Sequence, residues 1–147
     1  MFLLPLQLLA EQRERDLVFD EAKATANRLN KPLLNAGCGF KYWRAIMESN
    51  VNMDVVPRDV PNFVLGSIED MSMFYDKQFG AIFVAHVLEH VDNLARAKSE
   101  LERVADYQFI ITPSPLFLSS WLLPEHIRVF NDTKGMSVLA EIPKVRN

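Results

Sequence analysis

Two glycines and an aspartate are the residues whose types and spacing first suggest chemistry. Gly37 and Gly39 come directly after a short apolar run at 32–36, and a helix-like segment at 42–50 follows them. Residues without a Cβ let the chain turn sharply and let a ligand come close to backbone N–H groups. Asp54 follows Gly37 by 17 positions, close to the spacing of about 20 at which a carboxylate binds ribose hydroxyls in nucleotide-binding folds. This pattern indicates the opening strand, turn and helix of a nucleotide-binding unit.

A second candidate site is the sequence His-Val-Leu-Glu-His at 86–90. It matches a zinc signature, in which two histidines four positions apart share one face of a helix. However, it directly follows the apolar run at 80–85, so we expect His86 to end a strand. The sequence singles out no third ligand, and we therefore predict no metal site, with a zinc hydrolase as a remaining alternative. His126 is the third imidazole of the chain and a further candidate proton acceptor.

Composition limits the class of protein. The chain has 147 residues, of which 49% are hydrophobic and 24% charged, and this predicts one globular domain over 1–147 with a real core. Its net charge of −3 argues against binding nucleic acid mainly through phosphates. One cysteine excludes an internal disulfide and fits a reducing, cytoplasmic environment. The apolar segment 1–10 is too short to span a membrane, so we expect an N-terminal arm that packs on the domain or on a neighbouring subunit.

Strand-like and helix-like segments alternate along the chain. Helices are predicted at 11–30, 42–50 and from 92 or 93 to about 105, and strands at 33–36, 51–55, 63–65, 80–85 and 108–112. Such alternation predicts an α/β fold, a Rossmann-like three-layer sandwich with a mainly parallel sheet in the order 3-2-1-4-5. The charged residues 11–16 are expected to form a solvated helix end. Residues 116–123 are predicted as a helix or a buried loop, and 131–141 as a last helix.

Four segments in this order resemble the class I S-adenosylmethionine-dependent methyltransferases. They are 34–39 (Leu-Asn-Ala-Gly-Cys-Gly), 52–54, 65–70 and 79–90. The first and last of them are most similar to the methyltransferase type 11-like subgroup, whose first motif reads Leu-Asn-x-Gly-Cys-Gly and whose fourth strand ends in His-Val-Leu-Glu-His. The resemblance extends over about 32–130.

The resemblance implies an S-adenosyl-L-methionine cofactor and a set of residues around it. Asp54 would bind the ribose, Ser67 and Ile68 would contact adenine, and Ala85 and His86 would lie beside the methionine moiety, with Asn35 close to its amino group. His126 follows the fifth strand, where family members often build the acceptor side, so we expect His86 and His126 to line the reaction site. The implied cofactor-binding set is Asn35, Ala36, Gly37, Cys38, Gly39, Asp54, Val55, Ser67, Ile68, Ala85 and His86.

The sequence departs from the family pattern at several points. Asn35 stands where many members have an acid, and Lys41 replaces a third glycine. Ser67 replaces the usual aspartate of the adenine contact, which leaves Glu69 or Asp70 as alternatives. The family sheet has seven strands, and the short segment after the fifth strand predicts that the last two are absent or abbreviated. A homodimer that covers the exposed sheet edge is the hypothesis that follows.

The leading functional hypothesis is methyl transfer from S-adenosylmethionine to an unidentified acceptor. One alternative is a catalytically degenerate module that only binds the cofactor or a partner. A dinucleotide-dependent oxidoreductase is disfavoured because the third glycine of that fingerprint is missing.

Overall fold

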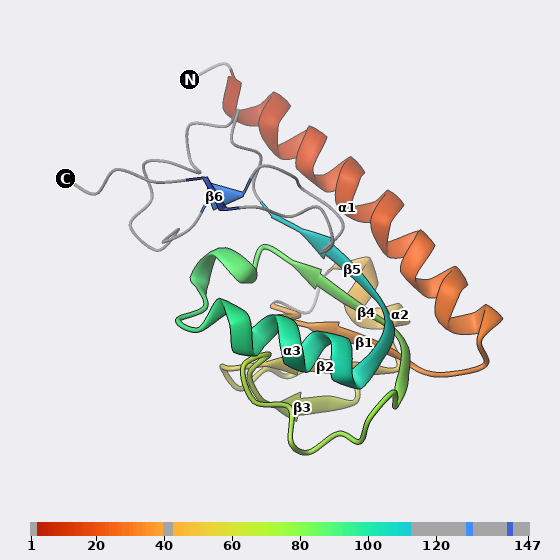
Figure 1. Cartoon of the computed structure of the whole chain (residues 1–147). Helices are drawn as coiled ribbons and strands as arrows, with labels where there is room; N and C mark the ends of the chain where they lie inside the picture. Colours follow the sequence, from red (N-terminus) through yellow and green to blue (C-terminus); the bar gives the residue numbers. More distant parts are fainter. Residues whose placement is uncertain (1–2, 40–42, 113–128, 131–140, 143–147) are drawn as a thin grey trace.

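The computed structural model describes residues 3–39, 43–112, 129–130 and 141–142 (Figure 1). Its centre is a five-stranded sheet in the order β3-β2-β1-β4-β5, in which all neighbouring strands are parallel. The strands are β1 (Leu33–Ala36), β2 (Val51–Asp54), β3 (Phe63–Leu65), β4 (Phe79–Ala85) and β5 (Ala105–Ile111). The predicted α/β class and strand order are thus confirmed.

Helices cover both faces of this sheet (Figure 1). On one face α1 (Leu3–Arg28) and α2 (Arg44–Glu48) enclose an apolar cluster that includes Phe19 and Phe83. On the other, α3 (Leu94–Val104) and the short 3-10 helix η1 (Leu88–His90) enclose a cluster that includes Ile82 and Leu101. Every residue of β4 is buried because this central strand has a helical layer on each side.

Helix α1 lies very close to the sheet at the start of β4. A Cβ added at Gly80 would lie 3.0 Å from the Cα of Ala26, so a larger residue there would require the helix or the strand to shift by a few tenths of an ångström. The backbone N–H of Lys31 donates to the Ala26 carbonyl at 3.1 Å, and the Lys31 ammonium pairs with Asp106 in β5 at 2.6 Å. The C-terminal end of α1 is therefore fixed to the sheet.

The predicted start of the first helix at Glu11 is wrong, whereas the packing expected of the N-terminal arm at 1–10 stays a prediction. Helix α1 begins at Leu3 rather than Glu11, and Pro5 lies within its first turn, where a missing N–H costs no helical hydrogen bond. Leu29 lies beyond the end of this helix and is 36% exposed, whereas Phe19 within it is buried. The start of β5 also differs from the prediction, because α3 leads into it at Ala105 without an intervening loop.

The region after β5 is described only in part. Val129–Phe130 (β6) and Glu141–Ile142 (β7) form an antiparallel pair, and neither strand joins the five-stranded sheet. The segment predicted at 116–123 and His126 lie outside the described residues. The helix predicted at 131–141 also lies outside them except for Glu141, which the structure places in β7.

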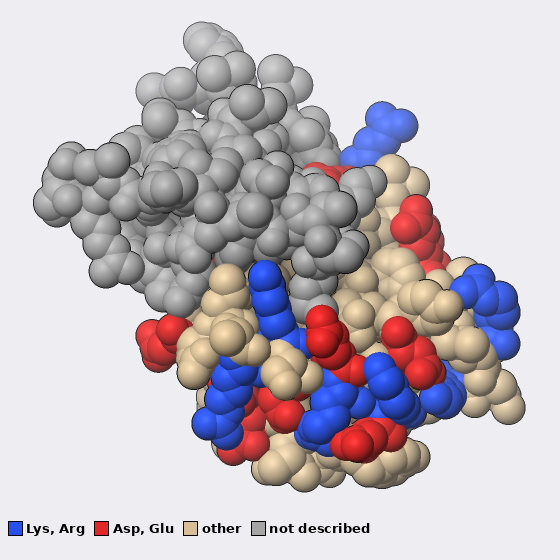
Figure 2. All heavy atoms as spheres, in the orientation of Figure 1, with Lys and Arg blue, Asp and Glu red and all other residues tan. Residues whose placement is uncertain are grey.

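None of the described helices combines the length and apolar character needed to cross a membrane. Figure 2 shows positive and negative side chains interspersed over the described part of one face.

Candidate functional site

A cavity of about 780 Å³ lies at the carboxyl ends of the central strands. Ligands of open α/β sheets bind at this edge, where the strand order reverses between β1 and β4. The segments after β1, β2, β3 and β4 each contribute to its wall, and α1 and Trp43 complete it. The lining residues are Gln12, Arg15, Gly37, Cys38, Gly39, Trp43, Met53, Asp54, Val55, Arg58, Gly66, Ser67, Ile68, Glu69, Ala85, His86, Val87, His90 and Val91.

The two glycines of the turn after β1 have different structural reasons. Both have left-handed backbone conformations, with φ of +70° at Gly37 and +72° at Gly39. A Cβ at Gly37 would collide with Cγ2 of Val87, whereas a Cβ at Gly39 would meet no atom of the described residues within 4 Å. Gly37 therefore permits both the turn and its close packing on the segment after β4, while Gly39 permits the turn on the cavity wall.

The backbone N–H groups of this turn are used inside the protein. Those of Gly37 and Cys38 donate to the Met53 carbonyl at 2.8 and 3.0 Å, and that of Gly39 donates to Oδ2 of Asp54 at 2.9 Å. The sequence had suggested that these donors face a ligand. Instead they fix the turn to β2. A ligand could therefore come close to the turn at 37–39, but it would not find free N–H donors there.

Asp54 ends β2 with its side chain on the cavity wall, and the residue is only 8% exposed. Besides the Gly39 N–H, its carboxylate accepts the Val56 N–H at 3.1 Å and Nε of Arg58 at 3.3 Å. The glycine turn and this acid thus line one cavity and contact each other directly. Their contact with a ligand stays a prediction.

Two residues of the predicted cofactor-binding set do not line the cavity. Asn35 and Ala36 are 1% and 0% exposed within β1. The Asn35 amide donates to Oδ1 of Asn52 at 3.2 Å, and the Asn52 amide donates to the carbonyls of Ile46 and Pro61 at 2.9 and 2.8 Å. In this structure, then, Asn35 ties β1 to β2, whereas the resemblance implied a place beside an amino group.

Five further residues of the predicted set lie together on the cavity wall, and their contact with a cofactor stays a prediction: Cys38, Val55, Ser67, Ile68 and Ala85. Burial, reinforced by the nearby Asp54 charge, raises the pKa of the Cys38 thiol, which disfavours a nucleophilic thiolate. Val55 is 66% exposed and forms part of the rim, whereas Ile68 is 3% exposed.

Of the two alternative carboxylates near Ser67, Glu69 lines the cavity and Asp70 does not. One Glu69 oxygen, Oε1, accepts the Asn93 N–H at the start of α3 at 2.6 Å. If the Glu69 carboxylate contacted adenine, it would do so while also accepting the hydrogen bond from the start of α3.

His86 and His90 both line the cavity, on either side of a buried carboxylate. His86 follows β4 directly, with φ +57° and its N–H bonded to the Ile111 carbonyl at 2.8 Å. Glu89 is 0% exposed, and its Oε1 lies 3.9 Å from Nδ1 of His86 and 3.5 Å from Nε2 of His90. Since His86 precedes η1, the two imidazoles do not share a helical face as the zinc signature requires. Within the described ranges, no three His, Cys, Asp or Glu side chains are grouped to hold a metal ion.

Sequence reasoning missed the contribution of α1 to the cavity. Gln12 and Arg15 line it, and the Arg15 guanidinium carbon lies 4.0 Å from the centroid of the Trp43 ring. Trp43 in turn packs against Phe83 of β4, with 5.6 Å between ring centroids. The available signal was that Arg15 lies four positions before Phe19, on the same helical face.

A parallel α/β sandwich with one large cavity beside a glycine turn and a strand-end acid defines a Rossmann-type ligand-binding domain. The chain belongs to the family described as a methyltransferase domain, because the model of that family matches residues 34–107, from β1 to β5 and half of the chain. The resemblance to class I methyltransferases is thereby confirmed at the level of the family, and the narrower subgroup stays a prediction. No curated protein matches the chain.

Proposed function

We propose that the protein binds S-adenosylmethionine in this cavity and transfers its methyl group to an acceptor. The observation that carries the proposal is the direct contact between the glycine turn and Asp54 on one cavity wall, within the segment matched by the methyltransferase family. A volume of about 780 Å³ also lies within the usual range of about 300–1,000 Å³ for small-molecule sites.

The use of the turn's N–H groups favours a methionine-bearing nucleoside over a dinucleotide. A pyrophosphate binds through N–H donors at such a turn, and at 37–39 these donors bond to Met53 and Asp54. S-adenosylmethionine has no phosphate. Its ribose hydroxyls are donors, and the Asp54 carboxylate is an acceptor that can take more than one of them.

Arg15 supplies the cationic group that the amino-acid end of this ligand needs. A guanidinium binds a carboxylate through two parallel hydrogen bonds, and stacking on Trp43 restricts its orientation before the ligand arrives. We place the methionine carboxylate at Arg15.

When bound, the sulfonium supplies an activated methyl group, and the protein supplies alignment and a water-poor site. An acceptor that must lose a proton needs a base at the cavity. His86 is the imidazole at the end of β4, and Oε1 of the buried Glu89 carboxylate lies 3.9 Å from its Nδ1. We assign the proton-accepting role to His86, with His126 as the second candidate.

Calorimetric titration with S-adenosylhomocysteine, S-adenosylmethionine, NAD and zinc tests the proposal. We expect binding of the first two only, and a loss of at least about tenfold in affinity for Asp54→Asn, since an amide accepts fewer hydroxyl hydrogen bonds than a carboxylate. Asp59→Asn, an exposed acid of the same loop, is the matched control. Binding of NAD without S-adenosylhomocysteine would refute the proposal.

Turnover is measured separately, with methyl-labelled S-adenosylmethionine and a panel of small-molecule, sugar, lipid and protein acceptors. Binding without transfer to any of them would favour the degenerate module.

A further inference from the structure

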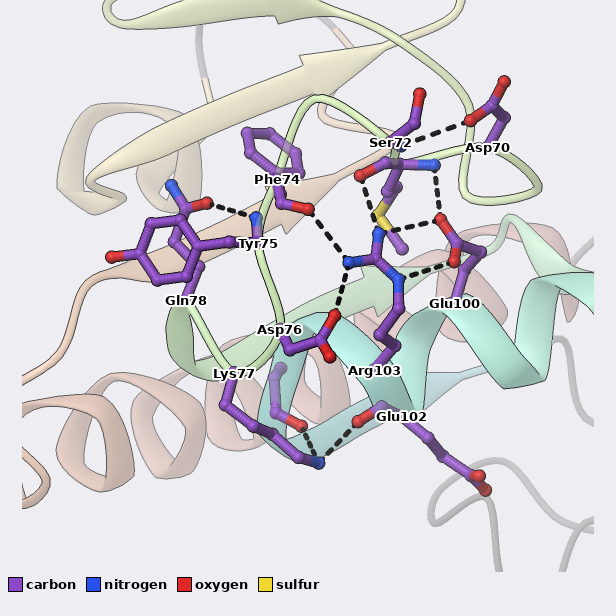
Figure 3. A network of polar contacts seen from close by, with 12 residues as sticks. Asp70, Ser72, Phe74, Tyr75, Asp76, Lys77, Gln78, Glu100, Glu102 and Arg103 are labelled. Carbon is purple, nitrogen blue, oxygen red and sulfur yellow. Dashed lines mark hydrogen bonds and ion pairs between the residues drawn. The ribbon is translucent and has the colours of Figure 1, made fainter.

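Helix α3 holds the loop between β3 and β4 through one guanidinium and one carboxylate (Figure 3). Arg103 pairs with Glu100 through two hydrogen bonds, at 2.8 Å from Nε and 3.1 Å from Nη2. Its Nη2 also donates to the Met71 carbonyl at 2.8 Å, and Nη1 donates to the Phe74 carbonyl at 2.9 Å. Glu100 accepts the Met71 N–H at 2.6 Å. The backbone of Met71 is thus held at both its donor and its acceptor.

These contacts are partly shielded from water and involve full charges. The side chains of Glu100 and Arg103 are 18% and 29% exposed, and Met71 beneath them is 0% exposed. The hydrogen bonds from Arg103 lower the pKa of Glu100, and those to Glu100 raise the pKa of Arg103. Both groups are therefore ionised near neutral pH, and their hydrogen bonds belong to the stronger, charge-assisted kind.

The segment held in this way is continuous with the cavity wall. Gly66, Ser67, Ile68 and Glu69 line the cavity, and Met71 follows two residues later. Residues 67–70 form one tight turn, in which the Asp70 N–H donates to the Ser67 carbonyl at 3.0 Å and the Glu69 N–H to Ser67 Oγ at 3.1 Å. Because the turn is closed by its own hydrogen bonds, a displacement of Met71 is transmitted to Ser67.

We propose that Glu100 and Arg103 are positioning residues for ligand binding. Neither side chain lines the cavity, and both act through Met71 to set the place of the 66–69 wall. The inference rests on the proposed function, with the adenine of S-adenosylmethionine at Ser67 and Ile68 in this wall, as the family resemblance implies. In this proposal, residues of α3 that do not touch the ligand determine how well the 66–69 wall binds adenine.

Arg103→Lys is the sharpest test, because lysine keeps the charge but lacks the planar fork that joins Glu100 to two carbonyls. We expect its Kd for S-adenosylhomocysteine to rise about tenfold, the loss of roughly one charge-assisted hydrogen bond. We also expect weaker discrimination against S-inosylhomocysteine, which lacks the exocyclic amine of adenine. Glu100→Gln should act in the same direction. Glu102→Gln, an exposed carboxylate on the same helix, should leave both quantities within about twofold.

Two readouts separate positioning from stability alone. Affinities are measured well below the melting temperature of each variant, so that a purely structural role would lower the melting temperature and leave the Kd and the base discrimination unchanged. That result would overturn the inference. In addition, hydrogen exchange of the ligand-free protein should show faster exchange of amides 67–71 in Arg103→Lys, and unchanged exchange would overturn the inference too.

The proposed function fails in a distinguishable way. If the unmodified protein does not bind S-adenosylhomocysteine, both the proposed function and the positioning role are refuted. If it binds normally and the variants bind equally well, only the positioning role is refuted.

Discussion

Substitution of Gly37 by alanine should destabilise the protein far more than the same change at Gly39. Both residues have φ near +70°, and an alanine in that conformation costs roughly 1–2 kcal/mol, partly offset by a less flexible unfolded chain. At Gly37 the added Cβ also collides with Val87 Cγ2. Overpacking of this kind costs typically about 1–3 kcal/mol more. We expect a loss of about 2–4 kcal/mol in the free energy of unfolding for Gly37→Ala and about 1 kcal/mol for Gly39→Ala.

A double-mutant cycle with Val87→Ala isolates the steric part. Because Val87→Ala removes the atom that the new Cβ would meet, Gly37→Ala in that background should cost about 1 kcal/mol, the same as Gly39→Ala. The free energies come from urea unfolding followed by circular dichroism, with the slopes compared to verify that the transition is unchanged. An equal cost of Gly37→Ala in both backgrounds would show that Val87 does not limit this position and would refute the packing argument.

Two further predictions concern α1 and α2. Arg15→Gln should weaken binding of S-adenosylhomocysteine by about tenfold or more, because a charged partner of the ligand carboxylate is lost. The control, Arg13→Gln on the same helix, should leave the affinity unchanged. Equal affinities of the two variants would exclude a carboxylate site at Arg15. Hydrogen bonds from Arg44 and Lys23 lower the pKa of Glu48 to about 2 from its usual 4.5, so their contribution to stability is present above about pH 4.5 and is lost as the pH falls toward 2. Urea midpoints measured across that range should fall less steeply for Glu48→Gln than for the unmodified protein, and parallel curves would contradict the assignment.

The strands were predictable because residues close to each strand in the sequence mark where it begins and ends. β1 lies between Pro32 and the glycine turn, and both β1 and β3 have the predicted bounds. β4 is a continuous apolar run, which is typical of a strand covered on both faces. Proline, glycine and apolar period act over a few residues, so these elements need no knowledge of distant partners.

The parts of the site that sequence reasoning missed depend on contacts between distant segments. The N–H groups of the glycine turn looked available because their acceptor, the Met53 carbonyl, belongs to another strand. Arg15 looked like one charge in a solvated helix end because only the tertiary fold brings α1 over Trp43. Asn35 matched a motif position, but its amide is held by Asn52 of β2. In each case the residue type indicated a possible role, but the sequence did not show which way the polar group points in the fold.

The contact at Gly80 has a consequence for the opposite end of the molecule. Ala26, near the C-terminal end of α1, rests on the sheet backbone there. Arg15 lies 11 residues before Ala26 in the same helix, which is about 16 Å at 1.5 Å per residue. With the helix acting as a stiff rod, a tilt of about 4° at that pivot displaces the guanidinium by about 1 Å over this length. A methyl group at Gly80 that pushed Ala26 away would therefore also move Arg15 and its side of the cavity wall, although Gly80 lies at the opposite end of β4 from the cavity residue Ala85.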